Sequence, residues 1–94
     1  MSLFTVIYKP GPRWIAGRRF HEQEGVSGHR DFLAERHAAG DLLVGGPFLD
    51  DTGGIAIYEA STDEELIALL QQDKTITGRL MTYELHPCAL PFMR

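Results

Sequence analysis

Two residues could together perform acid–base chemistry, the histidine at position 29 and the aspartate at position 73. His29 precedes Phe32 and Leu33 by three and four residues, so in a helix the three side chains share the face that packs inward. An imidazole titrates near neutral pH, which suits it to moving protons, and a buried carboxylate can orient it. Two interpretations of His29 are open: a group that acts on a ligand, or a histidine at the edge of the core.

Asp73 is notable because of what precedes it. The helix predicted before it ends at about Gln72, and the free carbonyls at the C-terminal end of a helix disfavour a negative charge by about 0.3–1 kcal/mol. An Asx-type turn leading toward Gly78 would account for an aspartate here, and so would a role in orienting an imidazole.

The long connection between residues 9 and 26 offers candidates for ligand binding. It holds one tryptophan and three arginines, Trp14, Arg13, Arg18 and Arg19. One interpretation is an aromatic cover with cationic steering of a small anion, and the other is a solvated loop pinned to the body by its tryptophan. Gly46 and Pro47 follow a predicted strand, where glycine lets either a ligand or a neighbouring strand approach the backbone closely.

The composition is that of a folded, acidic protein of one domain. Its 94 residues are 44% hydrophobic and 23% charged, with 9 Lys and Arg against 13 Asp and Glu, a net charge of −4. This balance argues against nucleic-acid binding, and no apolar run approaches the roughly 20 residues of a membrane span. Because Cys88 is the single cysteine and no signal-peptide pattern appears, we expect a cytoplasmic protein. Metal-binding spacings are absent, so we expect neither a metal site nor a cofactor.

The elements that must position these residues follow from hydrophobic periodicity and turn signals. Strands are predicted over residues 3–8, 42–44, 55–59 and about 79–86, and helices over about 27–39 and from the capping boxes at 61–65 to about 72. Gly40 is expected to end the first helix. The order β-α-β-β-α-β predicts an α+β ferredoxin-like fold, an antiparallel sheet with both helices on one face.

The first strand is apolar on both sides. Leu3 and Ile7 alternate with Phe4, Val6 and Tyr8, although two helices can cover only one face of the sheet. A second apolar face that complements itself predicts a homodimer packed sheet against sheet.

Several segments together resemble the YCII-related (YciI-like) family. They are Pro-Gly-Pro-Arg-Trp (10–14), Glu-Gln (22–23), His29 with Phe32 and Leu33, Gly-Asp-Leu-Leu-Val-Gly-Gly-Pro-Phe (40–48), Gly-Gly-Ile-Ala-Ile (53–57), and Asp73 before Gly-Arg-Leu (78–80). The resemblance covers nearly the whole chain and implies a single domain over residues 1–94 that forms a dimeric α/β barrel. It also implies an active-site His–Asp pair, matched here by His29 and Asp73. Lys74 stands where the family usually has proline, a departure at the turn that aims the carboxylate.

Two functional hypotheses follow. In the first, the protein is a cofactor-independent lyase, isomerase or hydrolase in which His29 moves a proton on a small anionic or phenolic ring while Asp73 holds the imidazole. One related branch of the family eliminates chloride from a hydroxylated aromatic ring, which implies chemistry of this kind. The residues predicted to bind the substrate are Arg13, Trp14, Gly46 and Pro47. In the second hypothesis the protein is a non-catalytic dimeric module that binds a ligand or assists other proteins.

Overall fold

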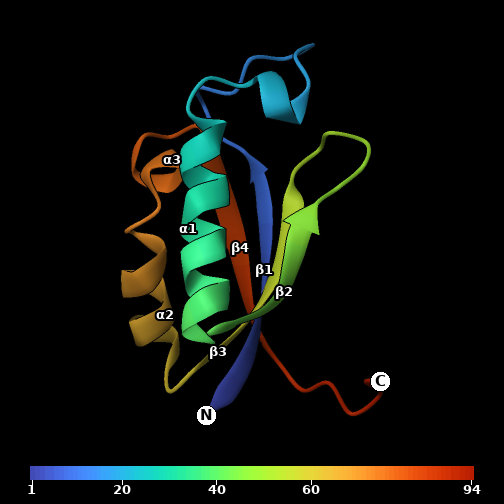
Figure 1. Cartoon of the computed structure of the whole chain (residues 1–94), viewed down its shortest axis with the longest axis vertical. Coiled ribbons are helices and arrows are strands. Elements are labelled where there is room, and N and C mark those ends of the chain that lie inside the picture. Colours follow the sequence, from blue (N-terminus) through green and yellow to red (C-terminus); the bar gives the residue numbers. More distant parts are fainter.

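Helices cover one face of a four-stranded sheet in this computed structural model, which describes residues 1–94 (Figure 1). The elements in chain order are β1 (Ser2–Pro10), the 3-10 helix η1 (Phe20–Glu22), α1 (Val26–Ala39), β2 (Leu42–Pro47), β3 (Gly54–Ala60), α2 (Asp63–Leu70), α3 (Lys74–Thr77) and β4 (Met81–Cys88). The strand order is β2-β3-β1-β4, and all neighbouring strands are antiparallel. The predicted α+β ferredoxin-like fold is confirmed.

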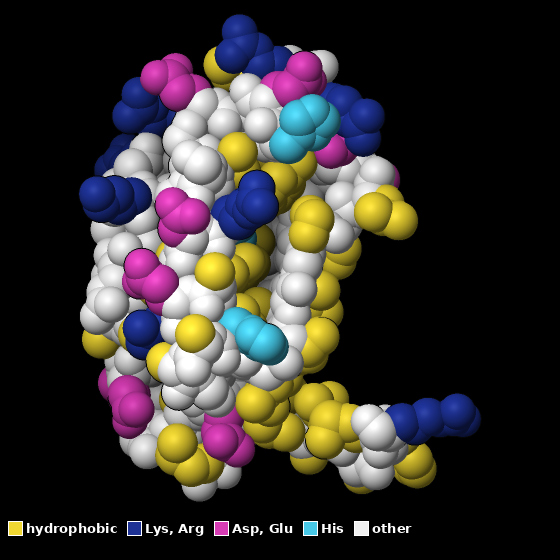
Figure 2. All heavy atoms as spheres, in the orientation of Figure 1, with side chains coloured by type: hydrophobic (Ala, Val, Ile, Leu, Met, Phe, Trp, Pro, Cys, Tyr) yellow, Lys and Arg dark blue, Asp and Glu magenta, His cyan; other side chains and the backbone are white.

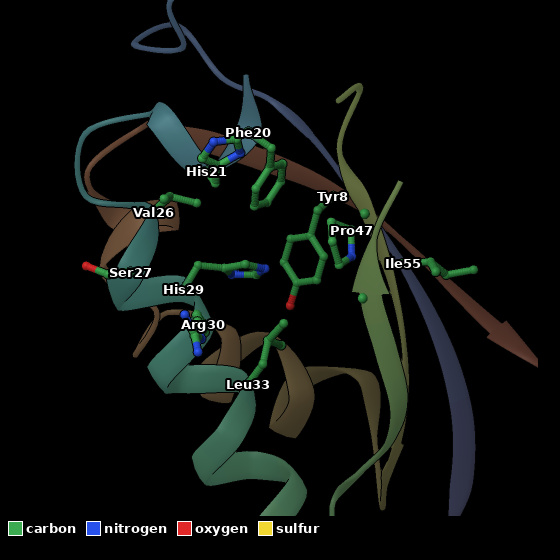
Figure 3. Close-up of a pocket in the computed structure, with 12 residues that line it drawn as sticks. Tyr8, Phe20, His21, Val26, Ser27, His29, Arg30, Leu33, Pro47 and Ile55 are labelled. Atoms are coloured by element: carbon green, nitrogen blue, oxygen red, sulfur yellow. The ribbon is translucent and has the colours of Figure 1, made fainter. Parts of the chain in front are cut away.

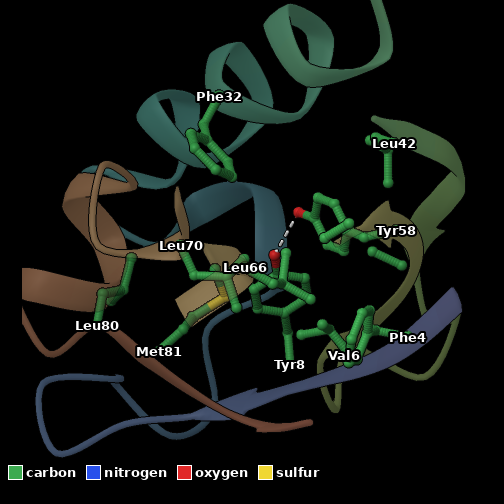
Figure 4. Packing of buried hydrophobic residues seen from close by; sticks show 12 residues of the cluster. Phe4, Val6, Tyr8, Phe32, Leu42, Tyr58, Leu66, Leu70, Leu80 and Met81 are labelled. Atoms are coloured by element: carbon green, nitrogen blue, oxygen red, sulfur yellow. Dashed lines mark hydrogen bonds between the residues drawn. The ribbon is translucent and has the colours of Figure 1, made fainter. Parts of the chain in front are cut away.

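The core lies between the sheet and the helices (Figure 4). On β1 the buried side chains alternate, Phe4, Val6 and Tyr8, and the register sets Phe4 opposite Tyr58 and Val6 opposite Ala56 of β3. The helices complete this core with Phe32, Leu66 and Leu70. Because strand side chains alternate between the two faces, this register aims the Tyr8 and Tyr58 rings at the helices.

Helix boundaries agree with the capping signals. Gly40 adopts a left-handed conformation with φ of 94° and ends α1, where its N–H bonds the carbonyls of Arg36 and His37. At the start of α2 the hydroxyl of Thr62 accepts a hydrogen bond from the Glu65 N–H at 3.1 Å. Of the two predicted N-cap residues, Ser61 and Thr62, Thr62 is therefore the one that begins this helix.

The segment after α2 differs from the prediction. The helix ends at Leu70, not near Gln72, and the separate four-residue helix α3 follows. Asp73 is the N-cap of α3 and accepts a hydrogen bond from the Thr75 N–H at 3.0 Å. The expectation that its carboxylate opposes a helix C-terminus is therefore wrong, because a helix of four residues is too short to leave a periodic signal in the sequence.

The other face of the sheet carries no helix (Figure 1). Leu3, Ile7 and Ile57 are half-buried there, and Val44 is 59% exposed. The C-terminal arm, residues 89–94, extends away from the body, and its Phe92 is almost fully exposed. None of the helices combines the length and the apolar composition needed to cross a bilayer.

Candidate functional site

The structure brings His29 and Asp73 together across 44 residues of sequence. Nδ1 of His29, in the first turns of α1, lies 2.5 Å from Oδ2 of Asp73, and both residues are buried. An ionised carboxylate only accepts hydrogen bonds, so Nδ1 donates and the neutral ring carries its free lone pair on Nε2. No group of the chain forms a hydrogen bond with Nε2.

Both oxygens of the Asp73 carboxylate are used. Oδ2 faces His29, while Oδ1 accepts hydrogen bonds from the Thr75 N–H at 3.0 Å and the Thr75 hydroxyl at 2.7 Å. Burial acts to raise the pKa of Asp73, but the hydrogen bonds from His29 and Thr75 outweigh it and hold that pKa below its usual range. The carboxylate therefore stays negatively charged although it is fully enclosed.

Lys74 occupies the first position of α3, directly after Asp73. Proline is favoured at the first position of a helix because its fixed φ suits the turn and its missing N–H is not needed there. Lys74 takes this position without disturbing the cap, since Asp73 keeps its hydrogen bonds to both Thr75 and His29. The departure from the family's usual proline therefore does not misdirect the carboxylate in this structure.

His29 lies on the wall of a cavity of about 370 Å³. Figure 2 shows the hollow between the helix layer and the sheet, with hydrophobic side chains inside it. The lining residues are Tyr8, Phe20, His21, Val26, Ser27, His29, Arg30, Leu33, Gly46, Pro47, Gly54 and Ile55. Figure 3 shows the His29 ring pointing into this space toward Tyr8. The cavity thus combines a largely apolar wall with two imidazoles, those of His21 and His29, and one guanidinium group, that of Arg30.

Aromatic rings surround the imidazole. The Tyr8 ring meets His29 edge to face with centroids 4.6 Å apart, and the Phe20 ring lies 6.4 Å away. Trp14 packs edge to face against Phe20 with centroids 5.5 Å apart and does not itself line the cavity. Close packing around the ring supports one fixed orientation of His29.

Two polar side chains hold the long connection, residues 11–25, over this end of the cavity. The buried Gln23 amide donates to the carbonyls of Ile15 and Arg18, and its oxygen accepts from the Ile15 N–H at 3.0 Å. The carboxylate of Asp51, in the β2–β3 turn, accepts from the Phe20 N–H at 3.1 Å. Neither role was predicted from the sequence. The Gln23 bonds lie within an irregular loop that has no periodic pattern, and the Asp51 bond joins residues 31 positions apart.

The predicted ligand-binding residues separate into two groups. Gly46 and Pro47 line the cavity together with His29. Arg13 instead lines a second hollow with Lys74 and Thr75, and Trp14 contacts Phe20 without lining the cavity. The structure therefore brings two of the four predicted binding residues to the cavity of His29.

Arg30 and Tyr8 are two of the wall residues that were not predicted as part of the site. Arg30 is the one cation on the wall, and its adjacency to His29 in the sequence was the available signal. Tyr8 lies in an alternating apolar strand, and this pattern alone predicts a core residue and no contact with a ligand. No three His, Cys, Asp or Glu side chains gather where they could hold a metal ion.

Comparison with known proteins gives the family. The YCII-related domain matches residues 4–88. The chain belongs to the YCII-related family. It is similar to the uncharacterised protein YjpA of Bacillus subtilis, with 38% identity over 56 residues, a match that covers 60% of this chain and only 66% of YjpA. The family predicted from the sequence is thus confirmed.

A solved structure shares the fold. The 5-chloro-2-hydroxyhydroquinone dehydrochlorinase TftG from Burkholderia phenoliruptrix, in complex with 2,5-dihydroxybenzoquinone, superimposes with a TM-score of 0.67. The match covers 93% of both chains at 24% sequence identity. At this identity the likeness shows the architecture of this YCII-related protein and not its reaction.

The hydrogen bonds of Asp73 predict a pH-dependent stability. Asp73→Asn should lower the free energy of unfolding by about 1–3 kcal/mol at about pH 5, because a charged acceptor is lost from a buried site. Since folding lowers the Asp73 pKa, the stabilisation is complete above the unfolded value of about 3.9 and is lost as pH falls through the folded value. Urea unfolding at several pH values should show the two proteins converging below about pH 4.

The matched control is Asp31→Asn, which removes an exposed carboxylate from α1. We expect a change within about 0.5 kcal/mol for this surface variant. A constant difference between wild type and Asp73→Asn down to the acid limit would contradict the assignment.

Proposed function

We propose that this protein is a small acid–base catalyst that moves a proton on a small cyclic substrate of anionic or phenolic character. The observation that carries the proposal is the buried His29–Asp73 pair at the wall of a largely apolar cavity. An imidazole that is oriented by a carboxylate and faces a ligand-sized space has the parts that a general base requires.

In this proposal Nε2 of His29 is the general base. Asp73 accepts the Nδ1 proton and fixes the ring, which leaves Nε2 available to a substrate. When Nε2 takes a proton, the negative charge of Asp73 stabilises the imidazolium. The lowered pKa of Asp73 keeps its carboxylate from competing for that proton. Side chains alone are enough for this transfer, so we propose that no cofactor takes part.

The cavity wall supports a small flat ring as the substrate. A volume of about 370 Å³ is at the lower end of ligand pockets, and Tyr8, Phe20 and Pro47 supply apolar surface. Arg30 would attract an anionic or phenolate oxygen. The ligand of TftG, a dihydroxybenzoquinone, is a planar ring with ionisable hydroxyls, which supports lyase or isomerase chemistry on a compound of this class.

The other predicted binding residues would act less directly. Trp14 would support the cavity through Phe20, against which its ring packs. Arg13 lines the neighbouring hollow, so its contribution would be long-range attraction of an anion rather than contact.

One observation favours the second hypothesis, a non-catalytic ligand-binding module. The His29–Asp73 hydrogen bond also joins α1 to the start of α3, and a purely structural bond would serve the fold in the same way. A module of this kind would bind a ring compound in the cavity without moving its protons.

We also propose that the protein is a homodimer packed through the open face of the sheet. The apolar residues of that face include Leu3, Ile7, Ile55, Ile57 and Val44, and no helix covers them. A two-fold pairing would bury the same patch on both copies.

The single free thiol, Cys88, supports a cytoplasmic location, where thiols stay reduced.

Proton transfer predicts exchange of ring hydrogens on a bound ligand. In D2O the protein should accelerate exchange of the C–H protons of 2,5-dihydroxybenzoquinone, followed by proton NMR. His29→Gln should slow the catalysed exchange by about 10²- to 10⁴-fold, the usual contribution of a general base. The control His37→Gln alters an exposed histidine of the same helix and should leave the rate unchanged.

Variants of two arginines test where the ligand binds, with 2,5-dihydroxybenzoquinone as the ligand and both its binding and its proton exchange followed by NMR. Arg30→Gln should weaken binding of the ligand more than Arg13→Gln, because only Arg30 lines the cavity of His29. Binding without exchange, unaffected by His29→Gln, would support the non-catalytic module. Absence of binding would contradict the proposed ligand class.

The open, apolar face of the sheet predicts that the protein is a homodimer in solution. Light scattering at low micromolar concentration should report about twice the chain mass of 10.5 kDa. Ile57→Lys should shift the protein to the monomer, because the charge would be desolvated at the centre of the interface. Ile67→Lys, on the outer side of α2, should remain dimeric. A monomeric wild type would overturn the proposed pairing.

A further inference from the structure

Two tyrosine hydroxyls form an isolated pair beside the cavity. The hydroxyl oxygens of Tyr8 and Tyr58 are 2.7 Å apart, and both residues are essentially inaccessible to solvent (Figure 4). Neither hydroxyl forms any other hydrogen bond with the chain. The negative charges of the buried Asp73 and the half-buried Asp41 act on Tyr58, but neither carboxylate accepts a hydrogen bond from the pair, and Oδ1 of Asp41 has no hydrogen-bond partner.

The tyrosine pair has one more hydrogen-bond donor than the bond between the two hydroxyls uses. Two hydroxyls carry two protons, and their mutual hydrogen bond uses only one of them. A buried O–H without an acceptor destabilises the fold, so the second proton needs a partner outside the chain. That partner must lie where one of the two hydroxyls reaches open space.

The geometry decides which tyrosine carries the spare proton. Tyr8 lines the cavity of His29, whereas Tyr58 does not. Donation from Tyr58 to Tyr8 therefore leaves the Tyr8 proton directed at the cavity, while the reverse order would direct the spare proton of Tyr58 into packed side chains. Burial, reinforced by the neighbouring Tyr58, raises the pKa of Tyr8 far above its usual range, and burial raises the pKa of Tyr58 to about 12. Both hydroxyls therefore remain neutral donors.

We propose that the Tyr8 hydroxyl, aligned by Tyr58, is a second group that contacts the ligand of His29. It donates a hydrogen bond to one oxygen of the ligand while Nε2 of His29 accepts a proton from a neighbouring position. The Tyr8 and His29 rings are 4.6 Å apart between centroids, so one small molecule can reach both. The inference rests on the proposed function and narrows its substrate class to a ring with a hydroxyl next to a carbonyl.

The proton and charge balance of such a step is simple. The ligand O–H or C–H bond breaks, an N–H bond forms at Nε2, and the electron pair moves onto the oxygen that accepts from Tyr8. Return of the proton from Nε2 to another atom of the ligand completes an isomerisation without an oxidant or a reductant. Tyr8 would stabilise the charge that develops on oxygen, the role of an oxyanion-hole donor.

The test uses tropolone, a small ring with a hydroxyl beside a carbonyl, and measures its binding by calorimetry. Tyr8→Phe should weaken binding about three- to tenfold, the value of one hydrogen bond between neutral groups. Tyr58→Phe should weaken it about twofold, because Tyr8 then loses its alignment. Tyr83→Phe, a tyrosine of β4 paired with Tyr8 across the strands, lies outside the cavity and should bind tropolone as wild type does.

His29→Gln separates this inference from the proposed function. If His29→Gln weakens tropolone binding and Tyr8→Phe does not, the role of Tyr8 is overturned and the acid–base proposal stands. If wild type binds neither tropolone nor 2,5-dihydroxybenzoquinone, which also carries a hydroxyl beside a carbonyl, the hydroxyl–carbonyl substrate class is overturned. If wild type and Tyr8→Phe exchange the quinone protons equally fast, the role of Tyr8 is overturned and the proposed function stands.

A second measurement needs no variant. In the free protein the Tyr58 hydroxyl proton should exchange slowly enough to be seen by proton NMR, because Tyr8 accepts it inside the core. The Tyr8 hydroxyl proton should become visible only when tropolone is bound. A Tyr8 proton that is protected equally in the free protein would show that it has an internal acceptor and would overturn the proposal.

Discussion

The buried hydrogen bond between His29 and Asp73 is the constraint on which the rest of the site depends. A carboxylate with no solvent exposure is costly to bury, and it is tolerated here because each of its oxygens has a donor. One oxygen caps α3 through Thr75, and the other fixes the imidazole of α1. The same residue therefore sets the position of a helix and the orientation of a ring, so that changes at Asp73 should affect stability and chemistry together.

The fold supplies the surroundings that this pair requires. The sheet register directs Tyr8 against the imidazole, and α1 brings Arg30 to the same wall. The long connection is held at the end of the cavity by Gln23 from within and by Asp51 from the β2–β3 turn. A small, mostly apolar space with one oriented imidazole is thus the joint product of a strand, a helix and a loop.

Much of this architecture follows from local sequence signals. The contacts that could not be predicted join residues far apart in the sequence. The inward position of His29 comes from helical periodicity, and Gly40 marks the helix end as its left-handed φ requires. The pairing of His29 with Asp73 spans 44 residues, so no periodicity could indicate it. The residue types left it as one of two interpretations, and the family resemblance favoured it. The hydrogen bond of Tyr8 could not be predicted from the sequence for a similar reason, because its partner, Tyr58, lies 50 residues away.

The central claim, that Asp73 holds His29 with Nδ1 protonated and Nε2 free, can be tested directly by the ring nitrogen chemical shifts of His29. In ¹⁵N-labelled wild type the neutral imidazole should show a protonated Nδ1 and a bare Nε2, and Asp73→Asn should weaken that preference. A neutral ring protonated at Nε2 in wild type, with Nδ1 bare, would contradict the account, because the general base would then point at Asp73 and away from the cavity.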